Sequence, residues 1–183
     1  KFNIQIGVGG VTGSCGTVVS WSQQIMEYLL QGSGGLWNNM SQGIVYCNYG
    51  VPPTTPYLSS YNVIDSYNLA GITGPARVNH SRTADLYNWW KSAMAQAAGF
   101  RFYAHTGGSL QTLLNYISPG FVIFFGAGSH AGILNSIEVD SRGNGWISLL
   151  HSNTSYWLGV IIVANWNIVN TPGNFPVTGF GGY

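Results

Sequence analysis

Charged side chains are scarce in this sequence. Only 6% of its 183 residues are Asp, Glu, Lys or Arg, against roughly 25% in an average soluble protein. The net charge is +1 and Lys and Arg do not cluster, so the chain lacks the basic face with which proteins bind nucleic-acid phosphates. Few charges also provide little of the repulsion that keeps copies of a protein apart. We therefore expect a secreted, extracellular protein with no nucleic-acid partner.

Long apolar runs and cysteines are also few. The longest apolar runs, residues 121–125 and 160–164, fall far short of the roughly 20 residues that span a bilayer, so we expect no integral membrane segment. The only cysteines are Cys15 and Cys47. Two cysteines in an oxidising compartment often form one disulfide, and this alternative has to be weighed against any role for a free thiol.

The first half of the chain has helical periodicity. Apolar residues recur at three- and four-residue steps over residues 16–31 and 83–98, which predicts two amphipathic helices. Ser14 is a candidate N-cap of the first helix, and a short third helix is expected over residues 110–116. The stretch 36–78, between the helices predicted at 16–31 and 83–98, is rich in Gly, Pro and Asn and is interpreted as a loop-rich insertion.

The second half is rich in β-forming residues. After a Ser-Pro-Gly turn, four runs predict strands at residues 121–125, 131–139, 146–150 and 158–164. Helices followed by strands favour the α+β class, in which N-terminal helices pack on an antiparallel sheet around one core. We expect a single domain over residues 1–183.

Cys15 is the candidate nucleophile. It lies at the start of the first predicted helix, within Gly-Ser-Cys-Gly-Thr. The positive end of a helix dipole and its unpaired amides lower the pKa of a thiol placed there, which favours the reactive thiolate. The same amides are suited to hold the oxyanion that forms during acyl transfer.

His130 is the candidate general base. It follows Gly-Ala-Gly-Ser and precedes Ala-Gly, and such small neighbours leave an imidazole accessible for proton transfer. His151 and Asn153 lie at the end of the next predicted strand. If the two strands are hairpin neighbours, His151 or Asn153 lies beside His130 and can fix the orientation of its ring.

The other ionisable residues have simpler interpretations. His80 and His105 lie in loop-like contexts, match no zinc-ligand spacing and are expected at the surface. Glu138 and Asp140, beside Arg142, are interpreted as a solvated turn and not as the carboxylate pair of a glycosidase.

These segments together resemble the papain-like amidase and peptidase group, which includes CHAP domains, NlpC-type peptidases and related bacterial amidases. The similarity is greatest in Ile-Ser-Pro-Gly-Phe-Val-Ile-Phe-Phe-Gly at 117–126 and Ser-His-Ala-Gly-Ile at 129–133, beside the group's Pro-Gly-Asp, Val-Ile-Phe-Phe and His-Val-Gly-Ile pattern. The chain departs from that pattern at Ser14 and Phe121, where the group usually has acidic residues.

The resemblance implies a papain-like fold and a cysteine-dependent amide hydrolase that cleaves peptidoglycan or a related peptide. Cys15 would be the nucleophile and His130 the base. The orienting residue would be His151 in an NlpC-type arrangement and Asn153 in a CHAP-type arrangement. No metal or organic cofactor is implied.

Two other classes of function stay open. A disulfide between Cys15 and Cys47 would remove the nucleophile and favour a non-catalytic filament or coat subunit, which would self-associate through the uncharged termini at residues 2–7 and 175–183. The 7 Trp and 11 Tyr residues also suit a carbohydrate-binding module, because aromatic rings stack on sugar faces.

Overall fold

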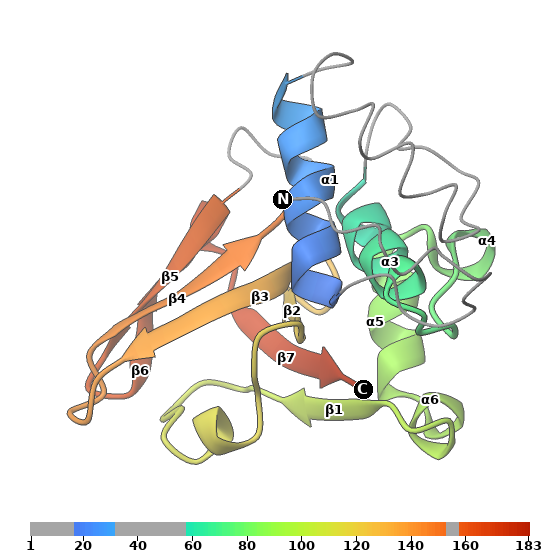
Figure 1. Ribbon diagram of the computed structural model, residues 1–183. Helices are drawn as coiled ribbons and strands as arrows, with labels where there is room; N and C mark the ends of the chain where they lie inside the picture. The colour runs from blue at the N-terminus through green and yellow to red at the C-terminus, as the bar shows by residue number, and fades with distance from the viewer. Residues whose placement is uncertain (1–16, 32–57, 153–157) are drawn as a thin grey trace.

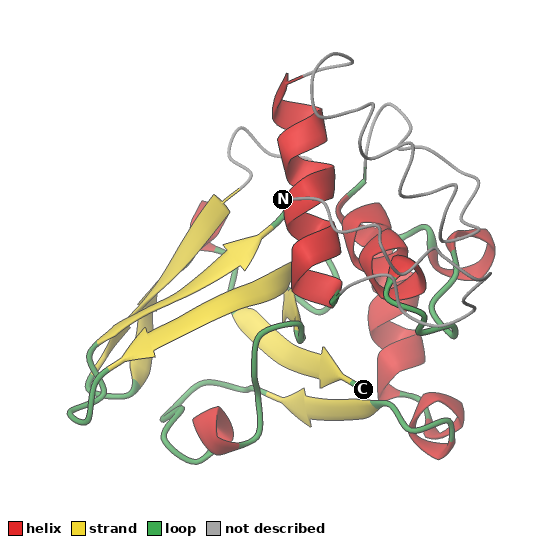
Figure 2. Cartoon of the chain, viewed as in Figure 1, coloured by secondary structure: helices red, strands yellow, loops and turns green. Residues whose placement is uncertain are grey.

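A computed structural model describes residues 17–31, 58–152 and 158–183 (Figure 1). The described helices are α1 (Val18–Gln31), α3 (Ser59–Leu69), α4 (Arg77–His80), α5 (Thr83–Lys91) and α6 (Ala93–Ala97). The strands are β1 (Arg101–Ala104), β2 (Val122–Phe125), β3 (His130–Val139), β4 (Gly145–Leu150), β5 (Leu158–Ala164), β6 (Asn167–Asn170) and β7 (Val177–Gly182). Short 3₁₀ turns are η2 (Leu113–Asn115) and η3 (Pro172–Asn174). Helices gather on one side of a sheet (Figure 2), so the α+β class is confirmed.

Every described strand belongs to one antiparallel sheet in the order β1-β7-β2-β3-β4-β5-β6. The C-terminal strand β7 lies inside this sheet, with Tyr103 opposite Phe180 on one side and Ile123 opposite Phe180 on the other. Residues 177–182 of the segment 175–183 therefore offer no open strand edge to another copy, because β7 already pairs along both of its edges. The N-terminal segment 2–7 lies outside the described residues.

The sheet curls so that its two edges approach each other. The segment that follows β1 hydrogen bonds to the turn between β5 and β6, where the amide of Leu110 donates to the carbonyl of Trp166 at 2.7 Å. The same segment stays attached to β7, because the amide of His105 donates to the carbonyl of Thr178 at 3.1 Å. A seam therefore runs between β6 and the end of β1.

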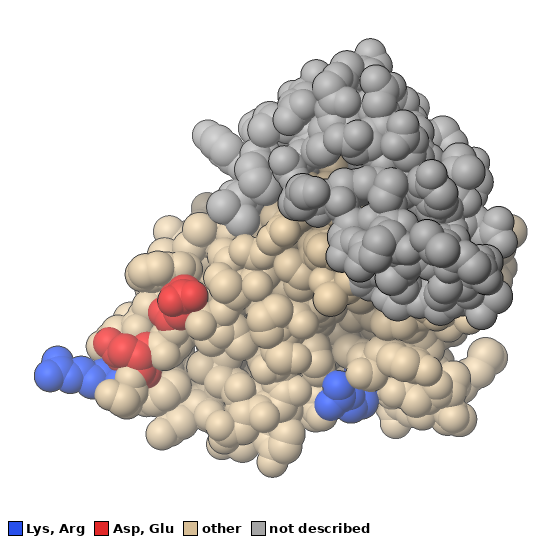
Figure 3. All heavy atoms as spheres, viewed as in Figure 1, with Lys and Arg blue, Asp and Glu red and all other residues tan. Residues whose placement is uncertain are grey.

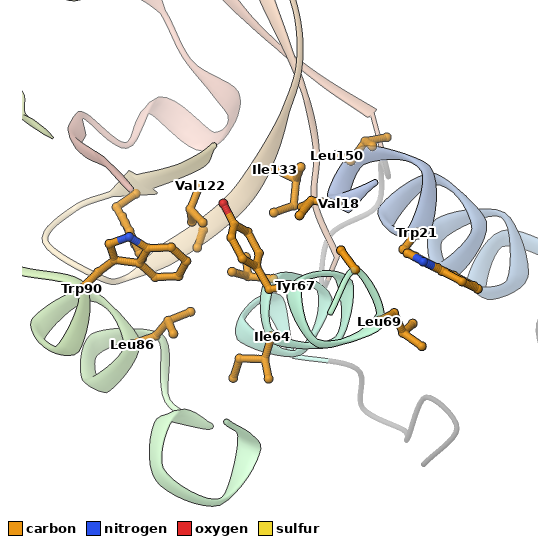
Figure 4. Close-up of a cluster of buried hydrophobic side chains, with 14 of the residues drawn as sticks. Val18, Trp21, Ile64, Tyr67, Leu69, Leu86, Trp90, Val122, Ile133 and Leu150 are labelled. Carbon is orange, nitrogen blue, oxygen red and sulfur yellow. The ribbon is translucent and has the colours of Figure 1, made fainter. Parts of the chain in front are cut away.

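Each face of the sheet carries its own core, since successive side chains of a strand point to opposite faces. On the helix side, α1, α3 and α5 cover the sheet (Figure 4) with a cluster whose labelled members are Val18, Trp21, Ile64, Tyr67, Leu69, Leu86, Trp90, Val122, Ile133 and Leu150. On the opposite face, inside the curl, a second cluster includes Leu110, Ile123, Phe125, Leu134, Ile147, Leu149, Ile161 and Phe180.

Helix α1 begins two residues later than the periodicity suggests. The Thr17 hydroxyl accepts from the amide of Ser20 at 3.1 Å, and the Ser20 hydroxyl accepts from the amide of Thr17 at 3.0 Å. This reciprocal pair caps the helix. Thr17 therefore takes the capping role expected of Ser14, which lies outside the described residues, and Cys15 precedes the cap by two positions.

The stretch 36–78 is not all loop. Its part before residue 58 lies outside the described residues, but α3 and the start of α4 fall within it. Most of α3 is buried, including Asn62 and Asp65. The Asn62 amide donates to the carbonyl of Leu150 at 3.3 Å and accepts from the Ser22 hydroxyl at 2.9 Å. The loop-rich interpretation is wrong for residues 59–69, because they form a helix. Through Asn62, this helix is hydrogen bonded to both α1 and β4.

The remaining predicted helices are shorter than expected. The predicted helix at 83–98 breaks at Ser92, whose extended backbone ends α5 and whose hydroxyl caps α6 by accepting from the amide of Ala95 at 3.2 Å. Residues 110–116 form only the 3₁₀ turn η2. The four predicted strands match β2 to β5 within one residue at each end, whereas β1, β6 and β7 were not predicted.

The described surface has few charges. On the face shown in Figure 3, isolated patches of Lys or Arg and of Asp or Glu stand on an otherwise uncharged surface. None of the described helices is long and apolar enough to cross a membrane.

Candidate functional site

A tight turn between β2 and β3 positions His130. Gly126, Ala127 and Gly128 all adopt positive φ angles of 54°, 55° and 99°, and the amides of Gly128 and Ser129 both donate to the carbonyl of Phe125. Gly128 also lies close to α5, because a Cβ atom there would stand 2.8 Å from the Cα of Ala84. The small residues that precede His130 are thus required by the turn and by its contact with α5.

His151 directly follows β4, the hairpin partner of β3. Ile133 pairs with Leu150, so the start of β3 lies beside the end of β4. The Nε2 atom of His130 lies 2.8 Å from the Nδ1 atom of His151, within hydrogen-bonding distance, and the two rings meet edge to face. The proximity expected for His130 and His151 is therefore observed.

The two histidines face the inside of the curl, away from the helices. Their chain neighbours Ala131 and Leu150 belong to the helix-side core, so the alternation of side chains turns His130 and His151 to the other face. The His130 ring lies 5.8 Å from the ring of Phe125, a residue of the second core.

His151 is almost fully enclosed, with 3% of its surface exposed, whereas His130 is half-buried. Gly159 on β5 makes this enclosure close, because a Cβ atom there would stand 2.7 Å from Nε2 of His151 and 3.1 Å from Pro172 of η3. The Nε2 atom of His151 is buried and has no hydrogen-bond partner among the described residues. A glycine at 159 is thus what leaves room for the imidazole.

Burial keeps both rings neutral. It lowers the pKa of His151 to about 4, with the nearby His130 adding a smaller effect in the same direction, and it lowers the pKa of His130 as well. Near neutral pH, one ring therefore donates the shared proton and the other accepts it. When His130 donates from Nε2, its Nδ1 atom carries a lone pair that can accept a proton from a third group.

The other predicted members of the site, Cys15 and Asn153, lie outside the described residues, as does Cys47. The start of α1 lies on the helix side of the sheet. A Cβ atom placed on Gly120 would lie 3.7 Å from the Cβ of Val18. Thr17 and Val18 also line a small pocket of about 190 Å³, and its described lining residues include neither His130 nor His151.

A different helix start meets the end of β4. The hydroxyl of Ser152 donates to the carbonyl of Leu58 at 3.0 Å, and Leu58 directly precedes α3. The hydroxyl of Ser59 in turn lies 3.0 Å from that of Thr83 at the start of α5. Sequence reasoning missed these contacts because it placed residues 59–69 in a loop. The usual start signal is missing, since the N-cap position is Leu58 and no side chain caps α3.

The remaining histidines differ from one another. His80 is buried, with 8% of its surface exposed, and its Nδ1 atom accepts from the amide of Ala76 at 3.1 Å while its ring tilts against Trp89. The surface interpretation is therefore wrong for His80. His105 lines a groove at the seam of the sheet. The described residues hold no cluster of three or more His, Cys, Asp or Glu that could bind a metal ion.

Of the two carboxylates near the end of β3, Glu138 belongs to the strand and pairs with Trp146 of β4, whereas Asp140 belongs to the turn. Asp140 accepts from the amides of Arg142 and Asn144 at 2.8 and 3.0 Å. Asp140 thereby closes the tight connection to β4, so the solvated-turn interpretation is confirmed for Asp140 and is wrong for Glu138.

No family model, curated protein or solved structure matches this chain.

Proposed function

We propose that this chain is a cysteine-dependent amide hydrolase of the papain-like type, secreted and acting on peptidoglycan or a related peptide. One observation supports this most directly: the hydrogen bond between Nε2 of His130 and Nδ1 of His151. A histidine at the start of one strand, oriented by a polar residue at the end of its hairpin partner, is the arrangement that a general base requires.

In this proposal the two histidines have different tasks. His130 is half-buried and His151 is enclosed, so His130 is the ring that substrate can approach. Because Nε2 of His130 is engaged by His151, Nδ1 is the atom left to exchange protons with the nucleophile. His151 is a positioning residue. Asn153, the alternative for this role, lies outside the described residues.

The reaction follows nucleophilic catalysis. His130 takes the proton of the Cys15 thiol, and the sulfur adds to the amide carbon of the substrate. Collapse of the tetrahedral intermediate breaks the C–N bond, and His130 gives its proton to the departing amine. Water, deprotonated by His130, then adds to the thioester carbon and releases the acid and the thiol. Backbone amides near Cys15 would hold the oxyanion.

The proposal requires Cys15 to reach the face of the sheet that carries His130. The start of α1 packs against Gly120 on the helix side. The decisive experiment must therefore show that the reactivity of the Cys15 thiol depends on His130. Iodoacetamide labelling of the unreduced protein, followed by peptide mapping, should show rapid alkylation of Cys15 and slow alkylation of Cys47. In the variant His130→Ala, the alkylation of Cys15 should slow at least tenfold near neutral pH.

Hydrolysis is measured on purified peptidoglycan by mass spectrometry of the released peptides. Cys15→Ala and His130→Ala should abolish release, whereas Cys47→Ala is the matched thiol control and should retain it. A disulfide between Cys15 and Cys47, or release unaffected by Cys15→Ala, would contradict the proposal. The disulfide result would instead favour a non-catalytic extracellular subunit on the same scaffold.

A further inference from the structure

The turn that presents His130 is attached to the start of strand β7 by two of its amides. The amide of Gly126 donates to the carbonyl of Pro176 at 2.8 Å. The amide of Ala127 donates to the side-chain hydroxyl of Thr178 at 3.0 Å. The other two amides of the turn donate to the carbonyl that directly precedes it. Among the described residues, Thr178 is therefore the one side chain that holds a backbone amide of this turn.

A β-bulge directs the Thr178 side chain to this position. The pairing of β2 with β7 shifts between Phe124 and Phe125, and the shift leaves Thr178 without a partner on β2. Val177 and Phe180 both belong to the second core, although residues three apart in a regular strand face opposite sides of a sheet. Bulges re-aim a side chain in this way, and they are frequent next to active sites.

The hydroxyl of Thr178 is used in both directions. It accepts from the amide of Ala127, and it donates to the carbonyl of Phe124 at 3.3 Å. Phe124 lies on β2, so this single oxygen joins the turn both to the strand before it and to β7. The backbone carbonyl of Thr178 also accepts from the amide of His105 at 3.1 Å. Bonds through its backbone and its side chain thus fix Thr178 relative to the turn.

Ala127 depends on this contact because its backbone lies in the left-handed region, with a φ of 55°. A residue that has a Cβ atom adopts this conformation at a cost in free energy that glycine avoids. Ala127 is exposed, so its methyl group gains little from packing. The hydrogen bond from its amide to Thr178 favours the left-handed conformation, and His130 follows only three residues later.

We propose that Thr178 is a positioning residue for His130. By holding the turn in one backbone conformation, its hydroxyl keeps the His130 ring where Nε2 lies 2.8 Å from Nδ1 of His151. The effect on catalysis rests on the proposed hydrolase function, in which His130 is the base. The orientation of the ring does not rest on it, because it can be measured without substrate.

The first test observes the histidine rings directly, by nitrogen NMR of the full chain near neutral pH. A fixed hydrogen bond between two neutral rings requires one protonated and one unprotonated nitrogen on each, with separate signals. Thr178→Val keeps the shape of the side chain but lacks the hydroxyl. In this variant the two His130 signals should move toward their mean, because a ring without a fixed partner exchanges between its tautomers. Thr178→Ser keeps the hydroxyl and should restore the separate signals.

Ser92→Ala is the matched control, and Thr178→Ala is the second variant if Thr178→Val does not fold. The Ser92 hydroxyl also accepts from an amide, that of Ala95, and donates to a carbonyl, that of Trp89. It lies between α5 and α6. Its loss removes the same two kinds of bond elsewhere in the fold, so the His130 signals should stay unchanged.

Peptide release from soluble peptidoglycan fragments is the second readout. Thr178→Val should lower kcat at least ~10-fold and leave KM within about twofold, because a misplaced base slows proton transfer without weakening substrate binding. Thr178→Ser should retain most of the activity.

Unchanged His130 signals in Thr178→Val and Thr178→Ala, or an equal change in Ser92→Ala, would overturn the proposal. Altered signals with an unchanged kcat would overturn its catalytic part. If the unmodified protein releases no peptide, the hydrolase function fails, and the ring signals alone then decide whether Thr178 positions His130.

Discussion

At the scale of single residues, the histidine pair depends on its glycine neighbours. Gly132 lies on β3, two residues after His130. A Cβ atom at this position would stand 2.7 Å from the Leu149 side chain and 3.1 Å from the Cβ of His151. Gly159 plays the same part on β5. The sequence predicts that the small residues beside His130 leave its ring accessible. In the structure, Gly132 makes space for Leu149 and the Cβ of His151, and Gly159 makes space for the enclosed ring of His151.

The lowered pKa of His151 predicts how stability changes with pH. Its pKa falls from an ordinary 6.5 to about 4 on folding, so below pH 6.5 the unfolded chain binds a proton that the folded chain does not. The free energy of unfolding should therefore fall as the pH drops from about 6.5 to 4, by about 1–3 kcal/mol from this residue. Urea unfolding at a series of pH values measures it.

The variant His151→Asn serves as the control for that profile. Asparagine does not titrate, so the dependence on pH should become flatter, although not flat, because burial also lowers the pKa of His80, His105 and His130. A profile identical to that of the unmodified protein would show that His151 titrates normally in the folded state.

At the scale of elements, short apolar runs between turn residues located the central strands, and β2 is buried on both faces. The strands at 122–125 and 145–150 lie where the sequence predicts them, since apolar runs bounded by Gly and Asn are unambiguous. Helix α3 was missed because polar Ser60, Asn62 and Asp65 are buried along with its apolar residues, so no amphipathic stripe remains to be recognised. Its polar residues bond to other elements instead of to water.

The candidate site was predictable only in part. The pairing of His130 with His151 follows from hairpin order, because consecutive strands are usually neighbours. The face on which the pair lies does not follow from order, since it depends on strand register and on the position of the turn. The sequence also contains no local signal that the start of α3 meets the end of β4, because that contact depends on tertiary packing.

Asn62 tests the structural role of α3. Its side chain links Ser22 of α1 to the carbonyl of Leu150, and Asn62→Ala leaves both groups without this partner in a buried site. We expect the free energy of unfolding to fall by about 1–3 kcal/mol, measured by urea denaturation. Asn79→Ala, at an exposed position, is the matched control and should change it by less than ~0.5 kcal/mol. Equal small effects would argue against a core position for α3.

At the scale of the whole molecule, closure of the sheet depends on the C-terminal strand. Strand β7 is the only described link between β1 and β2, so the last residues of the chain hold one edge of the curl to its centre. The opposite edge is held through the contact of Leu110 with Trp166. A chain with so few charges relies for this closure on strand pairing and apolar packing, since only two ion pairs join its described residues.

Two phenylalanines of the C-terminal segment test this dependence. Phe180 on β7 is fully buried in the second core, whereas Phe175, five residues earlier, is 48% exposed. Phe180→Ala should lower the free energy of unfolding by about 3–5 kcal/mol, because it removes a large side chain from a packed core. Phe175→Ala should lower it by less than ~1 kcal/mol. Denaturant unfolding of the two variants at equal concentration makes the comparison. If the C-terminal segment were a free arm that pairs with another copy, both substitutions would be mild in the monomer and Phe180→Ala would act only on self-association.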